Sequence, residues 1–181
     1  MSRYLALITA VLLGTATAQT PGAPEPKTAG DIPDNQAFVR YVNPAGYSLE
    51  VPEGWARTVQ GSSAHFEAKF NSLSVVLRRA SAAPDVVNVQ AGEVKALQKD
   101  AGVKVRSVKA IRLPSGSAVL IGYDSQSQPN AVTGQKVALE NSLYLLYKNG
   151  QEALLTLSAP KGTDNVDAWR RIANSFRWRQ P

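Results

Sequence analysis

The sequence contains no cysteine and only one histidine, His65, among its 181 residues. Without cysteine the chain has no thiol nucleophile, no thiolate metal site and no disulfide. A single histidine excludes any metal site that needs two histidine ligands. The run Ser62-Ser63-Ala64-His65 also lacks the Gly-x-Ser-x-Gly pattern that presents a hydrolase nucleophile. We therefore predict no catalytic residue, no resident metal and no cofactor, and we expect the protein not to be an enzyme.

Other catalytic and ligand-binding motifs are missing as well. The sequence has no phosphate-binding Walker loop, no dinucleotide glycine fingerprint and no zinc-protease helix motif. Two aspartate pairs, Asp31 with Asp34 and Asp164 with Asp167, lack the spacing of a calcium loop. An unusual hydrolase would need a cleft that brings His65 or paired carboxylates together with perturbed pKa values. That alternative has no support from the sequence pattern.

Long hydrophobic runs are also absent. The apolar run from Tyr4 to Leu13 is far shorter than the roughly 20 residues that span a bilayer, so we expect no transmembrane span. Arg3 precedes this run, and Ala16-Thr17-Ala18 follows it with the small residues that a signal peptidase reads. Residues 1–18 are therefore predicted to be a signal peptide, and the protein to be exported to the periplasm or cell surface. No cysteine follows Ala18, so we expect no lipid anchor.

Residues 19–37 are predicted to form a flexible, proline-rich N-terminal arm. They combine several prolines with glycine, lysine and threonine and have little apolar surface to bury. The arm is either a spacer or a segment that docks on a partner, and Pro24 and Pro26 are candidate partner-binding residues in the second case. Residues 38–181 are then expected to form a single domain, because their length and 44% hydrophobic content in the whole chain allow a core without disulfides.

Short runs with alternating or β-branched character predict strands through most of the domain. We expect a hairpin of 38–42 with 47–51, an extended stretch from Arg57, a tight turn at Asn71-Ser72, and a bulge between Arg106 and Val108. Asn149-Gly150 predicts a type I′ turn, since both residues accept positive φ values. The other predicted strands are 65–70, 73–78, 103–113, 118–123, 137–147 and 153–158.

Two segments have helical periodicity instead. The first begins at Pro84-Asp85, places Val87, Ala91, Val94, Leu97 and Ala101 on one face, and is expected to end with Gly102 in a left-handed conformation. Gly92 within it indicates either a close neighbour or local weakness. The second is expected to be capped by Asp164, with an apolar stripe of Val166, Trp169, Ile172, Ala173 and Phe176.

These predicted elements, in this order, resemble those of a known family. The runs Phe38-Val39-Arg40-Tyr41 and Gly46 to Trp55, together with the helix from Trp169 to Phe176, resemble the PsbP and Mog-type (DcrB-like) superfamily, whose bacterial members are often exported. The resemblance implies an α+β fold in which an antiparallel β-sheet is flanked by helices, an α-β-α sandwich. It also implies a non-catalytic role as an accessory subunit or binding module, and it brings no catalytic residue to this chain.

The net positive charge of the chain indicates which kinds of partner surface it could bind. The formal net charge is +6, and removing the one charge of Arg3 with the signal peptide leaves +5. Arginine and lysine residues could merge into a patch that contacts an anionic surface, or they could simply solvate one face of a sheet. No nucleic acid partner is expected, because the protein is predicted to be exported. Arg170 and Arg171 lie off the apolar stripe of the last helix and are candidate partner-binding residues.

The polar segment from Asp124 to Lys136 is longer than a simple hairpin needs, and it is either a contact surface or an unstructured excursion. Ser125, Gln126, Gln128 and Asn130 are its candidate contact residues. Together these features predict a secreted, non-catalytic accessory subunit that associates with a protein complex of the cell envelope. The alternative is a periplasmic or cell-surface carrier that holds a small apolar or anionic ligand between sheet and helix.

Overall fold

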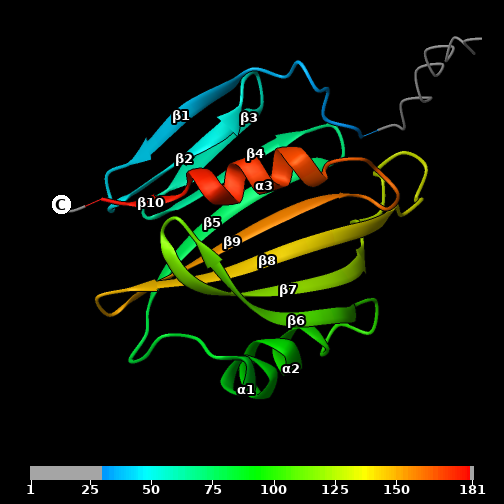
Figure 1. The fold of residues 1–181 in the computed structure, drawn as a ribbon. Helices are drawn as coiled ribbons and strands as arrows, with labels where there is room; N and C mark the ends of the chain where they lie inside the picture. Colours follow the sequence, from blue (N-terminus) through cyan, green and yellow to red (C-terminus); the bar gives the residue numbers. More distant parts are fainter. Residues whose placement is uncertain (1–29, 180–181) are drawn as a thin grey trace, which may run out of the picture.

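A computed structural model of the chain describes residues 30–179 (Figure 1). The predicted signal peptide and the candidates Pro24 and Pro26 lie outside the described residues. A seven-stranded antiparallel sheet dominates the fold. In spatial order its strands are β3 (Ala56–Gln60), β4 (Ser63–Ala68), β5 (Asn71–Arg79), β9 (Gln151–Pro160), β8 (Ala138–Lys148), β7 (Gly116–Gln126) and β6 (Lys104–Leu113).

A second, three-stranded sheet contains β1 (Phe38–Asn43), β2 (Tyr47–Pro52) and β10 (Arg177–Trp178), with β2 in the middle. Helix α3 (Val166–Ser175) packs beside β2 and lies across one face of the large sheet (Figure 1). On the other face lies a helical segment made of α1 (Val86–Val89), the π-helical η1 (Gln90–Val94) and α2 (Lys95–Leu97). The predicted α+β architecture, an antiparallel sheet flanked by helices, is confirmed.

Strand alternation divides the buried side chains into two clusters. The larger cluster joins the inner face of the large sheet to α3 and the small sheet, with Leu155, Leu49 and Ile172 fully buried. The smaller cluster packs Val89 and Val94 of the helical segment against the opposite face of β7 and β8. Neighbouring residues on β7 therefore face different clusters, which is why its sequence is a nearly continuous apolar run.

Several predicted turns and irregularities are confirmed. β1 and β2 form the expected hairpin, and β6 has a register shift between Val105 and Ser107. Asn149 and Gly150 have φ values of 50° and 79°, as a type I′ turn requires. The turn between β4 and β5 was misplaced, since it lies at Lys69 and Phe70, and Asn71 begins β5. Asn71 is buried, and its side chain donates a hydrogen bond to the Gly30 carbonyl at 2.8 Å, which offsets the cost of burying the amide.

The first helical segment differs from its prediction. Asp85 caps α1 as expected, with its side chain accepting a hydrogen bond from the Asn88 N–H. Val87, however, is 73% exposed, and Val89 and Val94 are the buried residues. The π-helical turn of η1 brings residues five apart onto one side, which a periodicity of 3.6 does not anticipate. Gly102 is not left-handed, and no described atom lies within 4 Å of a Cβ built at Gly92.

The second helix is also corrected at its start. The residue at the N-cap is Asn165 rather than Asp164, and Val166 is 60% exposed. Trp169, Ile172, Ala173 and Phe176 form the buried stripe, as predicted. Asn165 does not use its side chain to cap the helix, because that side chain points into a buried polar cluster with Gly30, Ile32 and Asn71.

Residues 30–37, which we assigned to the flexible arm, pack against the domain. Ile32 belongs to the larger core cluster and is 7% exposed. Its backbone N–H donates to the Asn165 Oδ1 at 2.7 Å. Ile32 and the Gly30 carbonyl therefore have buried partners in the domain, whereas Pro33, Asp34 and Asn35 are exposed.

Candidate functional site: the α3 groove

A groove of about 340 Å³ lies between α3 and the β6–β7–β8 half of the large sheet, and we call it the α3 groove. Ile111, Leu120 and Tyr144 from three adjacent strands form its apolar floor. Trp169 and Ala173 of α3 form one wall. The polar side chains along it are Arg106, Glu140, Ser142, Asn165, Arg170 and Asn174.

The groove follows from how far α3 reaches across the sheet. The helix is ten residues long, and it lies nearer to the small sheet than to β6 (Figure 1). The apolar side chains of β6 and β7 that face α3 are consequently only half-buried, as Ile111, Leu113 and Leu120 show. An apolar floor that remains open to solvent beside polar groups has the composition of a binding site.

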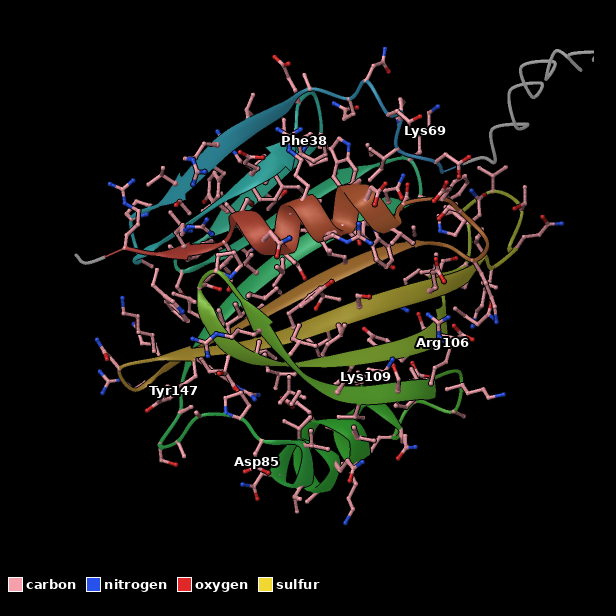
Figure 2. The ribbon with its side chains drawn as sticks, viewed as in Figure 1. Phe38, Lys69, Asp85, Arg106, Lys109 and Tyr147 are labelled. Carbon is pink, nitrogen blue, oxygen red and sulfur yellow. The ribbon has the colours of Figure 1, made fainter. Side chains whose placement is uncertain are left out.

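A chain of charges borders the groove on the strand side. The Arg106 guanidinium lies 3.1 Å from Asp124 and 3.4 Å from Glu140, and Lys161 contacts the second Asp124 oxygen at 2.8 Å. Figure 2 shows Arg106 and Lys109 along β6. The bulge in β6 lies next to Arg106, and bulges of this kind redirect side chains.

Tyr144 is the most buried polar side chain on the floor of the groove. It is 8% exposed, and burial raises the pKa of its hydroxyl, although a hydrogen bond with Ser142 and the positive charge of Arg170 act in the opposite direction. The hydroxyl therefore stays protonated at neutral pH and can both donate and accept a hydrogen bond.

The two candidate arginines of α3 occupy different environments. Arg170 lines the groove and pairs with Asp167 at 2.8 Å. Arg171 points toward the small sheet, where its guanidinium contacts Glu50 at 2.7 Å and lies 4.3 Å from the centre of the Phe38 ring. Both are exposed, as predicted, but they do not form one surface.

The polar loop is shorter than its predicted range. Ser125 and Gln126 belong to β7, and β8 begins at Ala138, so the loop covers residues 127–137. Ser125 accepts a hydrogen bond from Asn141, and Asn130 accepts the N–H groups of Val132 and Thr133 within its own turn. Gln126 and Gln128 are exposed. Asp124, at the base of this region, connects it to the groove through Arg106.

The basic side chains do not merge into a single patch. Arg78 bridges Glu93 of η1 and Glu152 of β9 on the face opposite to the groove. In the β6–β7 register, Lys109 and Arg112 stand at positions of opposite parity and so face opposite sides of the sheet. This scattered arrangement agrees with our alternative interpretation, in which the basic residues form the solvent-exposed face of a sheet.

Residues 30–179 carry neither a metal-binding cluster nor a membrane-spanning helix. In that part of the chain no group of three or more acidic or histidine side chains is arranged to hold a metal ion. The structure does bring Asp31 and Asp164 together, since the Asp164 N–H donates to Asp31 at 3.0 Å. Among the same residues, no helix combines the length and apolar content needed to cross a membrane.

The sequence matches no protein-family model and no curated protein. Solved structures, in contrast, share its fold. The solution structure of cyanobacterial PsbP (CyanoP) from Synechocystis matches with a TM-score of 0.55 and 17% identity, covering 83% of this chain and 97% of CyanoP. This chain has the Mog1/PsbP-like fold. The resemblance that the sequence indicated is thereby confirmed for the fold.

Two further structures with the Mog1/PsbP-like fold are less similar. The Ran-binding protein Mog1p of Saccharomyces cerevisiae has a TM-score of 0.50 and 10% identity, covering 80% of this chain and 96% of Mog1p. PA94 of Pseudomonas aeruginosa, a protein of unknown function, has a TM-score of 0.50 and 16% identity, covering 80% of this chain and 99% of PA94. At these identities the likeness is one of fold.

The sequence placed a ligand site between sheet and helix only in the carrier alternative, and of the residues that line the α3 groove of this Mog1/PsbP-like fold it named only Arg170 as a binding candidate. Tyr144, Ser142 and Glu140 were assigned only to a strand, and Trp169 and Ala173 to core packing. The one local signal was the break in alternation near Arg106, which predicted the bulge but not the ion pairs around it. The groove joins residues from β6, β7, β8 and α3, which are up to 68 positions apart in the chain.

Proposed function

We propose that this protein is a non-catalytic binding protein that works outside the cytoplasm as an accessory subunit of a cell-envelope protein complex. The α3 groove is the observation that supports this proposal. Its open apolar floor lies beside Trp169, Tyr144 and Arg170, and tryptophan, tyrosine and arginine are the residue types that dominate binding energy at interfaces. At about 340 Å³ the groove suits a short apolar segment inserted by a partner.

The fold gives this proposal weaker support by analogy. Mog1p, which shares the fold, is named for binding the protein Ran. Fold likeness alone does not transfer a partner, so the envelope location rests on the predicted signal peptide. We propose that the contact surface extends to Gln128 and Asn130 of the loop and to Pro24 and Pro26 of the arm. Arg171 is proposed to contact the partner separately, beside the small sheet.

A site-specific photo-crosslinker tests the accessory-subunit proposal. Benzoylphenylalanine replaces Val166, which is 60% exposed and lines the groove. The matched control replaces Val87, which is 73% exposed on the opposite helical segment. In the producing cells we expect one discrete protein adduct, in the envelope fraction, for the Val166 position and none for Val87. Equal adducts at both positions, or none at either, would contradict the proposal.

The groove also favours a second candidate function, that of a small-ligand carrier. The Tyr144 hydroxyl, the Arg170 guanidinium and the Asn174 amide all border the same apolar space, as a carrier pocket requires. Native mass spectrometry of gently purified protein distinguishes the two candidates. A carrier would retain a bound small molecule that is lost in Val166→Trp, which fills the groove entrance, and retained in Val87→Trp. An accessory subunit would show the mass of the bare chain.

A further inference from the structure

A second hollow lies away from the α3 groove, between β1 and β3, and we call it the edge cleft. Its volume is about 410 Å³, and residues Val39 to Val42 of β1 form one side. Half-buried Trp55 and exposed Arg57 form the other side, and the buried Phe66 contributes to the floor. The edge cleft shares no lining residue with the α3 groove.

Both strands beside the edge cleft are edge strands. β1 pairs only with β2 in the small sheet, and β3 pairs only with β4 in the large sheet. No strand within residues 30–179 pairs with the outer side of either one. Such edges present unpaired N–H and C=O groups that can accept a further strand.

The remaining edge of the large sheet is protected, whereas β3 is not. β6 carries Lys104, Arg106, Lys109 and Arg112 along its length and contains the bulge, and both features discourage pairing with another chain. β3 carries Arg57 as its single charged residue and is regularly paired with β4 along all five of its residues. The protein therefore blocks one edge of this sheet and leaves the other available.

The inner face of β3 is also incompletely covered. Val59 stands opposite Ala64 in the β3–β4 register, and Arg57 stands opposite Phe66. Ala64 and Phe66 are each 2% exposed, but Val59 on the same face is 45% exposed. On β1, Val39 and Val42 are 43% and 44% exposed. A strand added beside β3 would bury apolar surface that the domain itself leaves open.

The positive charge of the edge cleft indicates what kind of segment can bind there. Arg40 and Arg57 line it, and no acidic side chain is among its described lining residues. Arg40 is paired only loosely, at 3.8 Å from Glu50, and the Arg57 guanidinium lies 5.8 Å from the centre of the Tyr41 ring. An incoming carboxylate would therefore meet two exposed guanidinium groups beside an aromatic ring.

We propose that the edge cleft binds an extended segment of another protein, which carries a carboxylate and apolar side chains on one face, and that this segment adds as a strand to the free edge of β3. Arg57 and Val59 lie on the same face of β3, so a carboxylate beside Arg57 and an apolar side chain beside Val59 stand two positions apart, on one face of the added strand. This interaction is independent of the α3 groove, so either can fail without the other.

A selection experiment identifies the segment without assuming its sequence. A displayed library of random peptides of about twelve residues is selected against the full chain, and the enriched peptides are synthesised. We expect peptides with an acidic residue two positions from an apolar one. Binding should slow hydrogen exchange of the β3 amides, and a proline at the peptide centre should abolish binding because it removes a ladder N–H.

Matched charge reversals test the role of the cleft. Arg57→Glu should weaken binding about tenfold or more, whereas Arg112→Glu on the protected edge, with the same change in net charge, should leave it within about threefold. If Arg57→Glu does not fold, Val59→Asn provides the same test, with Val76→Asn as its control. Enriched peptides without acidic residues, protection outside β3, or equal binding to both charge-reversed proteins would overturn the proposal.

Discussion

Asn165 shows how one buried polar side chain organises its surroundings. It is 2% exposed, and its Oδ1 accepts the Ile32 N–H at 2.7 Å. Its Nδ2 contacts the Gly30 carbonyl at 3.0 Å and the Asn71 Oδ1 at 3.1 Å. One amide therefore joins the N-terminal segment, β5 and the start of α3, three parts of the chain that no local pattern connects.

We predict that Asn165→Ala lowers the free energy of unfolding by about 2–3 kcal/mol, because it leaves buried hydrogen-bonding groups without partners. Asp164→Ala is the matched control, since Asp164 is exposed and its side chain does not cap α3. That control should cost less than about 0.5 kcal/mol. Urea unfolding measures both. A larger cost for Asp164→Ala would mean that the sequence-based assignment of the cap was right.

Three buried tyrosines make the protein sensitive to alkaline pH. Burial raises the pKa of Tyr47, Tyr123 and Tyr144 above the ordinary value of about 10. Above that pH the unfolded chain loses these protons while the folded chain keeps them, so the free energy of unfolding falls as pH rises.

We therefore expect full stability from these tyrosines below pH about 10, and a loss of up to about 1.4 kcal/mol per pH unit for each tyrosine above it. Urea unfolding at a series of pH values between about 9 and 11.5 checks this expectation. Tyr47→Phe should flatten the dependence, because Tyr47 is fully buried. A slope unchanged by Tyr47→Phe would contradict the assignment.

At the scale of elements, the helical segment between β5 and β6 is the least regular part of the fold. Its α1 and α2 parts are four and three residues long, with a π-helical turn between them. Arg78 ties the segment to the sheet through Glu93 and Glu152, at 2.5 and 2.6 Å. Burial lowers the pKa of Arg78, but hydrogen bonds and charges from both carboxylates outweigh it and raise the pKa overall.

Gly92→Ala is predicted to stabilise the protein by about 0.5–1 kcal/mol, because a new Cβ meets no described atom within 4 Å and alanine favours helix. Gly150→Ala in the β8–β9 turn is the opposite case, since φ there is 79°. It should destabilise by about 1 kcal/mol or more. Thermal unfolding of both variants measures the difference. Destabilisation by Gly92→Ala would show that the π-helical turn needs glycine.

For the whole molecule, Ile32 joins the N-terminal segment to the larger core. Ile32→Ala should cost about 2–4 kcal/mol, because it opens a cavity between this segment and the rest of the cluster. Asn35→Ala, at an exposed position of the same segment, should change stability by less than about 0.5 kcal/mol. Equal effects in chemical unfolding would mean that the segment does not contribute as a packed part of the domain.

Patterns of neighbouring residues predicted most of the elements but little of the two candidate binding surfaces. Alternation identified the hairpin of β1 and β2, and Asn149-Gly150 identified the turn between β8 and β9, because both signals act over a few residues. Of the α3 groove, the sequence predicted Arg170 as a binding candidate, Trp169 on a buried stripe and, in the carrier alternative, a ligand between sheet and helix. The edge cleft was missed because the availability of β3 depends on which strands do not pair with it.

The sequence by itself determined the absence of thiol chemistry and most of the strands and helices, since these follow from composition or from periodicity along the chain, and the fold was indicated by the family resemblance. The tertiary structure alone decided that Arg170 and Arg171 face different surfaces, that Ile32 is core, and that α3 covers only part of the sheet. These features depend on how elements far apart in the chain pack together, and a packed core accepts only one such arrangement.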